Sequence, residues 1–281
     1  MMNVRLQLCR ATAALLALAA NSAAQPAQGD AKPPALWFPV GETLVYRLRW
    51  GLLPLGTARM ESRWVERDGR KLLLLRYTSH TNRVFDRIRP VDDVIESLLD
   101  PDTFLPVEFT RTLIRRRPLC DETTQFDRAK QIAHWHSRCS GKQKAFPIKP
   151  DTRDWLTFMY LLRKDKLPEK SRLSFPVVGD DKVSELVLTT HEIRKLRLGK
   201  FGKVPALALQ PHAEFKGLVS KDWKMWMWVT DDARRLVARI AINMPIGSVK
   251  ATLCRVQGPG DDFWTRRSED DQPECRPPVD Q

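Results

Sequence analysis

Short segments of alternating apolar and polar residues, separated by turn residues, occupy most of this 281-residue chain. In residues 43–50, Leu44, Tyr46, Leu48 and Trp50 take every second position, which places them on one face of a β-strand. Comparable segments lie at 57–66, 71–80, 89–99, 107–117, 121–126, 132–136, 171–177, 183–198, 204–211, 222–229, 236–244 and 249–256. Short strands at this spacing predict one antiparallel all-β domain.

One segment, residues 151–164, has helical periodicity instead. We expect Asp151 to cap this helix, Asp154 to favour its N-terminal dipole, and Arg163 and Lys164 to suit its C-terminal end. Apolar residues form a stripe along this helix, and further apolar residues extend the stripe around most of its circumference. We therefore expect the helix to be enclosed by the rest of the domain. The stripe consists of Trp155, Phe158, Met159 and Leu162. The predicted fold is a mostly β, strongly curved antiparallel sheet or open barrel around this one helix, and a two-sheet β-sandwich is the alternative.

The N-terminus has the pattern of a cleaved secretory signal peptide. Arg5 and Arg10 precede an apolar run at 11–20, and small residues follow at 22–24. The run is shorter than the ~20 residues that a bilayer requires, so we expect a periplasmic or secreted protein with no transmembrane anchor after cleavage. The expected organisation is a signal peptide at 1–24, a disordered Pro-rich leader at 25–36, a β domain at 37–256 and an irregular C-terminal tail at 257–281.

The chain is basic, with a net charge of +13, of which Arg5 and Arg10 contribute +2, leaving +11 after cleavage. Lys and Arg side chains spread over the solvent-exposed faces of the strands account most simply for this excess of positive charge, and the alternative is an anionic partner. An exported protein rarely meets nucleic acid, so we expect no nucleic-acid partner. The partner that we consider is a lipid or an envelope polymer.

Four cysteines remain after Cys9 leaves with the signal peptide, and an even number in an oxidising compartment predicts two disulfides. A hairpin that turns at 127–130 places residue 120 nearly opposite residue 137. Two cysteines at 120 and 139 would then lie within the ~4.4–6.8 Å Cα separation that a bridge requires. We therefore predict Cys120–Cys139 and Cys254–Cys275.

The chain contains three ordered motifs. The first, at 38–58, runs from Phe38-Pro39-Val40-Gly41-Glu42 to Gly56; the second, at 154–163, begins with Asp154-Trp155-Leu156; and the third, at 228–253, contains Asp231-Asp232 and Gly247. Together they resemble the bacterial family known as domain of unknown function 3108. The resemblance covers roughly residues 37–256 and implies an exported, mostly β protein. It assigns no activity and no catalytic residues.

Two groups of residues are candidates for chemistry. His134 and His136 share a strand face and could offer two ligands to zinc, but the sequence places no third ligand beside them. Clustered acids at 92, 93 and 96 could serve in acid–base catalysis. Solvated side chains are the favoured interpretation of both groups, and we expect no metal and no cofactor.

The segment at 223–229 is apolar on both faces of a predicted strand. Trp226 and Trp228 share one face, whereas Trp223, Met225 and Met227 share the other. We predict that the helix stripe packs against this strand, either as core or as the wall of a ligand pocket. The candidate ligand-binding residues are Trp155, Phe158, Met159, Leu162, Trp226 and Trp228.

The favoured function is a non-catalytic envelope protein that binds or carries an apolar or anionic ligand. The alternative is a metal-dependent or hydrolytic envelope enzyme. The sequence identifies neither the ligand nor the oligomeric state.

Overall fold

The computed structural model describes residues 34–87, 91–114, 120–179, 181–212, 224–245, 247–268 and 275. The predicted signal peptide, most of the predicted leader, and Trp223 lie outside these residues.

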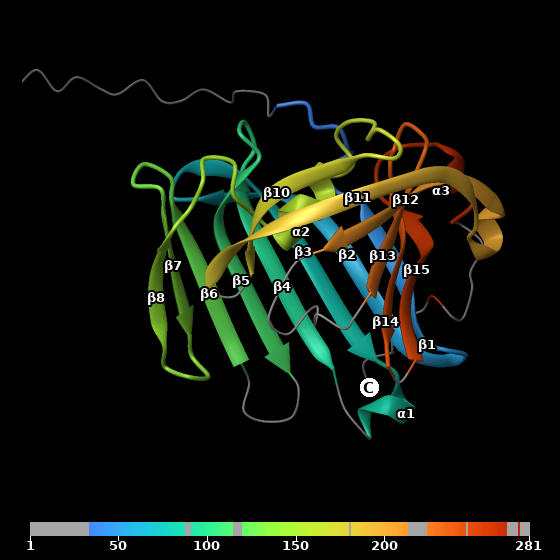
Figure 1. The fold of residues 1–281 in the computed structure, drawn as a ribbon, viewed down its shortest axis with the longest axis horizontal. Helices are drawn as coiled ribbons and strands as arrows, with labels where there is room; N and C mark the ends of the chain where they lie inside the picture. Colours follow the sequence, from blue (N-terminus) through green and yellow to red (C-terminus); the bar gives the residue numbers. More distant parts are fainter. Residues whose placement is uncertain are drawn as a thin grey trace, which may run out of the picture. The chain divides into compact units, whose positions relative to one another are not determined.

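The described residues include fifteen strands that form one sheet, which confirms the prediction of a mostly β, mostly antiparallel domain (Figure 1). Each strand predicted from the sequence is present. The strands are β1 (Thr43–Trp50), β2 (Leu53–Arg67), β3 (Arg70–Thr81), β4 (Asp92–Asp100), β5 (Leu105–Ile114), β6 (Cys120–Asp127), β7 (Ile132–Ser137), β8 (Gln143–Pro147), β9 (Arg153–Asp154), β10 (Arg172–Gly179), β11 (Lys182–Arg197), β12 (Lys203–His212), β13 (Lys224–Thr230), β14 (Val237–Met244) and β15 (Gly247–Gln257).

The strand order is β8-β7-β6-β5-β4-β3-β2-β1-β15-β14-β13-β12-β11-β10-β9. Neighbouring strands are antiparallel except β9 and β10. The first and last long strands, β1 and β15, pair with each other and join the two halves of the chain. Because the described strands all belong to one sheet, they do not form the two-sheet sandwich that the sequence leaves open.

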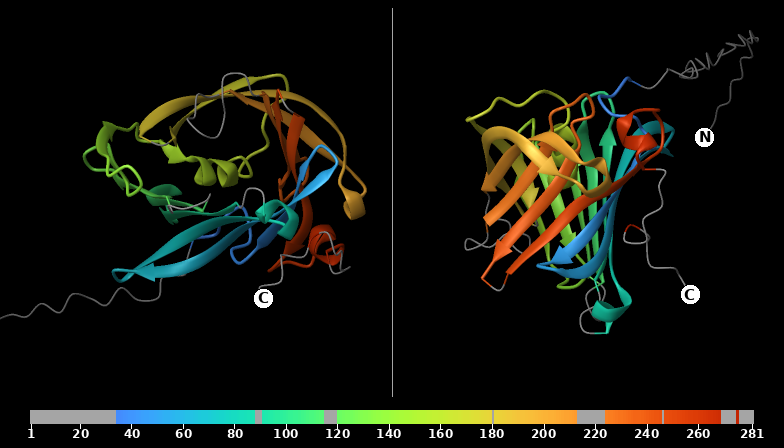
Figure 2. Two further views of the ribbon diagram at one scale, coloured as in Figure 1. Left: turned by 90° about the horizontal axis from the view of Figure 1, so that it is seen from below. Right: turned by 90° about the vertical axis from the view of Figure 1, so that its right-hand side faces the viewer.

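The two edges of the sheet are formed by β8 and β9, which are consecutive in the chain. Fifteen flat strands would span about 65 Å, whereas the short connection at 148–152 reaches only about 20 Å. The sheet must therefore bend until its edges approach each other. Two ion pairs, each at 3.2 Å, link the β8 edge to the β10–β11 hairpin near the other edge. Lys144 of β8 pairs with Asp181, which lies between β10 and β11, and Lys149, just after β8, pairs with Glu185 of β11. The edges do not pair, so the sheet is not closed into a barrel, and Figure 2 shows the bend from below.

The helix predicted at 151–164 is shorter in the structure, because α2 covers Trp155–Leu161. Arg153 and Asp154 form β9 beside Val177 and Val178, so they are extended and not helical. Asp154, and not Asp151, caps the helix: its side chain accepts a hydrogen bond from the Thr157 amide at 2.8 Å. Five of the seven residues of α2 are buried, and the helix contacts β3, β4 and β10.

The described residues contain further short helices besides the one that was predicted. These are α1 (Arg83–Asp86), α3 (Phe263–Arg266) and the 3-10 helix η1 (Gly199–Phe201). The helix α3 lies in the tail that the sequence predicts to be irregular. Its Trp264 is buried and donates a 2.7 Å hydrogen bond to Asp232, which holds this part of the tail against the domain.

Candidate functional site

A cavity of about 360 Å³ lies between α2 and the strands. Its walls come from β1 to β4 on one side and from β10 to β15 on the other, so the bend of the sheet creates it. The walls are mainly apolar, and they include Tyr46, Leu48, Ala58, Met60, Tyr77, Val91, Val177, Leu186, Pro211, Met225, Met227, Ile240, Ile242, Val249 and Ala251. A concave apolar site of this size is typical of a pocket for a small ligand.

Three of the six predicted ligand-binding residues line the cavity. Trp155, Phe158 and Met159 reach it from α2. Leu162 is buried in the core but does not line the cavity. The helix stripe therefore divides between the cavity wall and solid core.

The two tryptophans of β13 are not part of the cavity wall. Trp226 and Trp228 alternate with Met225 and Met227, which do line it, and adjacent residues of a strand point to opposite faces. The two indoles stack with centroids 6.2 Å apart, and Trp226 also contacts His191 at 5.0 Å. The predicted division of this strand into two faces is right, but the methionine face is the inner one.

Few polar groups reach the cavity. Asp93 is buried in its wall, and Ser79 pairs with Asp93 across β3 and β4. The Trp155 indole nitrogen is buried and has no hydrogen-bond partner among the described residues. Tyr46 donates a 2.9 Å hydrogen bond to the Val237 carbonyl, and burial raises the pKa of this phenol, so it remains a neutral donor. The cavity thus suits an apolar molecule that carries few polar atoms.

A buried ion cluster lies outside the cavity wall, and sequence reasoning missed it. Arg163 forms two hydrogen bonds with Glu42, and the two side chains are 2 % and 0 % exposed. Arg234 lies 3.6 Å from the same carboxylate and pairs with Asp262 at 2.6 Å. Burial acts to lower the pKa of Arg163, but the attraction and hydrogen bonds of Glu42 outweigh it and raise that pKa.

Arg163 therefore does not serve the helix dipole as predicted. Its carbonyl also accepts a hydrogen bond from Arg235 at 3.0 Å. Glu42, Arg163 and Arg234 come from the three separate motifs of the sequence, so the fold brings the three motifs together in one buried cluster. Glu42 and Arg163 are 121 residues apart, so no local sequence signal identifies the cluster.

The candidate catalytic groups do not converge. Asp92 pairs with His80 at 2.7 Å, Glu96 lies 3.5 Å from Arg76, and Asp93 lies in the cavity wall. Within the described ranges, no group of three or more His, Cys, Asp or Glu residues could hold a metal ion, so His134 and His136 have no third ligand there.

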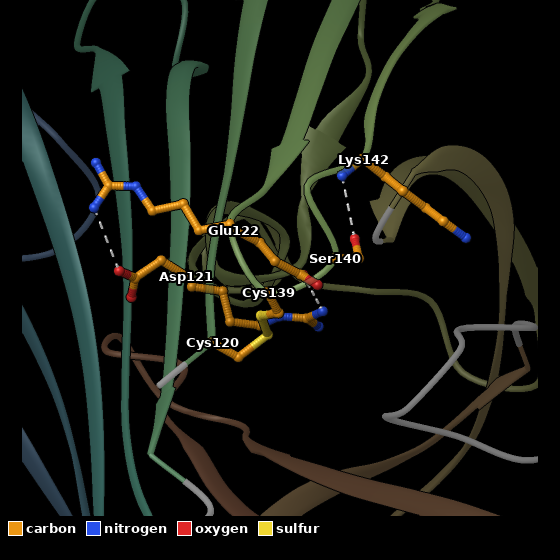
Figure 3. The surroundings of a disulfide bond; sticks show 8 residues. Cys120, Asp121, Glu122, Cys139, Ser140 and Lys142 are labelled. Atoms are coloured by element: carbon orange, nitrogen blue, oxygen red, sulfur yellow. Dashed lines mark hydrogen bonds and ion pairs between the residues drawn. A yellow bond between two sulfur atoms is a disulfide. The ribbon is translucent and has the colours of Figure 1, made fainter. Parts of the chain in front are cut away.

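The cysteines lie in the two predicted pairs. Cys120 and Cys139 are bonded with a Cα separation of 5.0 Å (Figure 3). The register pairs Glu122 with Ser137, which places residue 120 opposite 139 and not opposite 137 as predicted. Cys254 and Cys275 are bonded with a Cα separation of 6.2 Å and lie beside Val45 in a small buried cluster.

One solved structure with a TM-score above 0.5 shows the same kind of fold. The β-barrel-like protein of the domain of unknown function DUF1849 from Brucella abortus aligns over 79 % of this chain and 99 % of its own, with a TM-score of 0.52 and 12 % identity. A protein of Bacteroides fragilis NCTC 9343 with a YmcC-like fold aligns over 80 % of this chain and 100 % of its own, at a TM-score of 0.33 and 8 % identity.

No curated protein matches the chain. Among the described residues, no helix is both long enough and apolar enough to cross a bilayer. The model of the protein family of unknown function DUF3108 matches residues 45–253. This match covers most of the sheet and the whole of α2, and the chain therefore belongs to the DUF3108 family.

Proposed function

We propose that this protein is a non-catalytic envelope protein that binds an apolar ligand, such as a lipid acyl chain, in the cavity beneath α2. The observation that carries the proposal is the cavity itself, about 360 Å³ in volume and almost entirely apolar. A solid core of the same composition would fill this space, because protein interiors pack closely.

The side chains around the cavity favour an adaptable binding site. Met60, Met159, Met225 and Met227 all line it. Methionine is unbranched and flexible, so it adjusts to ligands of different shape. The ligand class that fits best is therefore a hydrocarbon chain of variable structure, and not one rigid molecule.

An extracytoplasmic location supports this proposal. The N-terminal sequence has the pattern of a secretory signal peptide, and the two disulfides are of the kind that persists in an oxidising compartment. Lipids and their fragments are the abundant apolar molecules of a bacterial envelope, and a soluble carrier would shield them from water.

The first test is mass spectrometry of lipids that co-purify with protein recovered from its native envelope, followed by titration of delipidated protein with a fluorescent fatty acid. Ala251→Phe places a large side chain in the cavity, and we expect it to weaken probe binding at least about tenfold. Gln257→Phe adds the same side chain at an exposed, uncharged position of the same strand, away from the cavity, and should leave binding unchanged. Equal affinity in the two variants would contradict the proposal.

The second test concerns Trp155, which contacts Tyr77 with ring centroids 5.6 Å apart and is only half-buried. Truncation of a large aromatic in solid core costs ~3–5 kcal/mol. Because Trp155 borders the cavity, we expect Trp155→Ala to cost clearly less stability and to impair lipid retention. If Trp155→Ala instead lowers the unfolding free energy by the ~3–5 kcal/mol of a core truncation, and the wild type contains no ligand, the carrier function is refuted.

A further inference from the structure

One end of the domain carries the most exposed large apolar side chains of the described residues. Leu52 and Leu53, at the tip of the β1–β2 hairpin, are 86 % and 56 % exposed, and Val84 of α1 is 67 % exposed. The two elements are joined, because the Asn82 amide donates a 2.7 Å hydrogen bond to the Leu55 carbonyl. The Asn82 side chain also donates to the Pro54 carbonyl at 2.5 Å. We call this surface, formed by residues 51–55 and 82–87, the tip surface.

The cavity extends to the same end of the sheet. Leu53 pairs with Trp50, and Leu48, two residues earlier in β1, lines the cavity. Val249 pairs with Trp50 from β15 and also lines it. The tip surface therefore lies within a few residues of the cavity wall, at the end away from α2.

Cations surround the tip surface. Arg83 and Arg87 are exposed in and after α1, and Lys250 is exposed opposite Arg49, whose side chain donates to the Leu52 carbonyl at 2.7 Å. Lys224, at the start of β13, is exposed at the same end.

Two acidic side chains at the tip-surface end of the domain, Asp86 and Asp92, already interact with other residues. Asp86 accepts a hydrogen bond from Thr81, and Asp92 pairs with His80. Among the described residues, the tip surface thus combines protruding leucines with an excess of positive charge.

We propose that the tip surface docks onto an anionic phospholipid bilayer, with Leu52 and Leu53 inserted among the headgroups. Apolar side chains that enter the interface and cations that attract anionic lipid are the two contributions that hold a protein on a membrane surface. This orientation directs the nearby end of the cavity toward the bilayer, from which an acyl chain would enter. The inference rests on the proposed function only for this last step, since docking itself requires no ligand.

The test is flotation of the exported protein, recovered from the envelope, with vesicles of phosphatidylcholine alone or of phosphatidylcholine mixed with phosphatidylglycerol. We expect the wild type to float with the mixed vesicles, to float less with phosphatidylcholine alone, and to dissociate as salt is added. Leu52→Glu combined with Leu53→Glu should weaken binding to mixed vesicles about tenfold or more. Both side chains are exposed, so the fold should survive, and Val84→Glu provides an independent second variant.

Phe263→Glu is the matched control, because Phe263 is 43 % exposed but lies in α3, which follows the opposite end of β15. This variant should float like the wild type. Wild-type protein that fails to float with either vesicle overturns membrane docking and leaves the tip surface as a protein-binding surface. A double variant that floats like the wild type, or a Phe263→Glu variant that loses as much binding as the double variant, also overturns it.

Titration with the fluorescent fatty acid, in the absence of vesicles, separates this inference from the proposed function. Failure of docking leaves probe binding intact, whereas failure of the proposed function abolishes probe binding and leaves flotation intact.

Discussion

Replacement of Glu42 by Gln should strongly destabilise this protein. Glu42 is the carboxylate that faces Arg163 and Arg234 in the buried cluster, and its side chain is fully buried. Glutamine has nearly the same size and shape, so the substitution removes the negative charge without leaving a void. Arg163, which is also buried, then keeps its positive charge without a counter-ion.

The magnitude follows from the contacts of the two arginines. Removal of one partner of a buried ion pair typically costs about 3–5 kcal/mol. Arg234 retains Asp262 at 2.6 Å, and the amide oxygen of the introduced glutamine can still accept one hydrogen bond, so we expect the lower end, about 3 kcal/mol. For a domain of this size, that loss lowers the Tm by about 6–12 °C.

Urea denaturation followed by tryptophan fluorescence, together with calorimetry, measures this loss. Glu192→Gln is the matched control, because Glu192 makes the same kind of pair with Lys170, at 2.9 Å, on the exposed surface. Solvent screens that pair, so the control should unfold at the wild-type midpoint. A Glu42→Gln variant within about 1 kcal/mol of the wild type would show that the cluster does not act as a buried charge network.

Three further predictions concern local features. Burial raises the pKa of Asp154 above its ordinary value of 3.8, against the opposing hydrogen bonds from Ser97 and Thr157. The folded state therefore keeps the Asp154 carboxyl protonated to a higher pH than the unfolded chain does. Because the folded state binds more protons in this range, the unfolding free energy of the wild type falls as the pH rises from 3.8 through the raised pKa. Asp154→Asn lacks this titration, so its stability relative to the wild type should improve across that window in denaturation curves at several pH values. At Gly56, an added Cβ would lie 1.9 Å from the His80 carbonyl oxygen, so Gly56→Ala must separate β2 from β3 and should cost about 2 kcal/mol or more by urea denaturation. Replacement of both Cys254 and Cys275 by Ser opens a loop with a sequence separation of 21 and should cost ~3 kcal/mol in the chain-entropy model. Non-reducing peptide mapping that joins Cys120 to Cys254 would refute the pairing.

Most of the sheet was predictable because alternation is a local signal. Alternation predicts the first strand at 43–50, where β1 lies. The strands that sequence reasoning missed lack this signal: β8 buries only Phe146, and β9 consists of two residues. The predicted helix start is wrong because Asp151 and Asp154 are equally good capping residues, and only the pairing of β9 with β10 chooses between them.

The candidate site was predictable only in part. Alternation correctly separated Trp226 and Trp228 from Met225 and Met227, but it could not show which face is inside. That choice depends on which side of the sheet becomes concave. Helical periodicity likewise grouped Leu162 with Trp155, although the cavity ends before Leu162.

The sequence by itself determined the class of secondary structure, the approximate positions of most strands, the cysteine pairs and the family, because each of these depends on residues close together in the chain or on ordered motifs. Only the tertiary structure decided the cavity and the buried cluster. Glu42 and Arg163 are 121 residues apart, and the cavity wall combines strands from both halves of the sheet. Both features exist because the sheet bends until its edges approach each other, and this bend is a property of all the strands together.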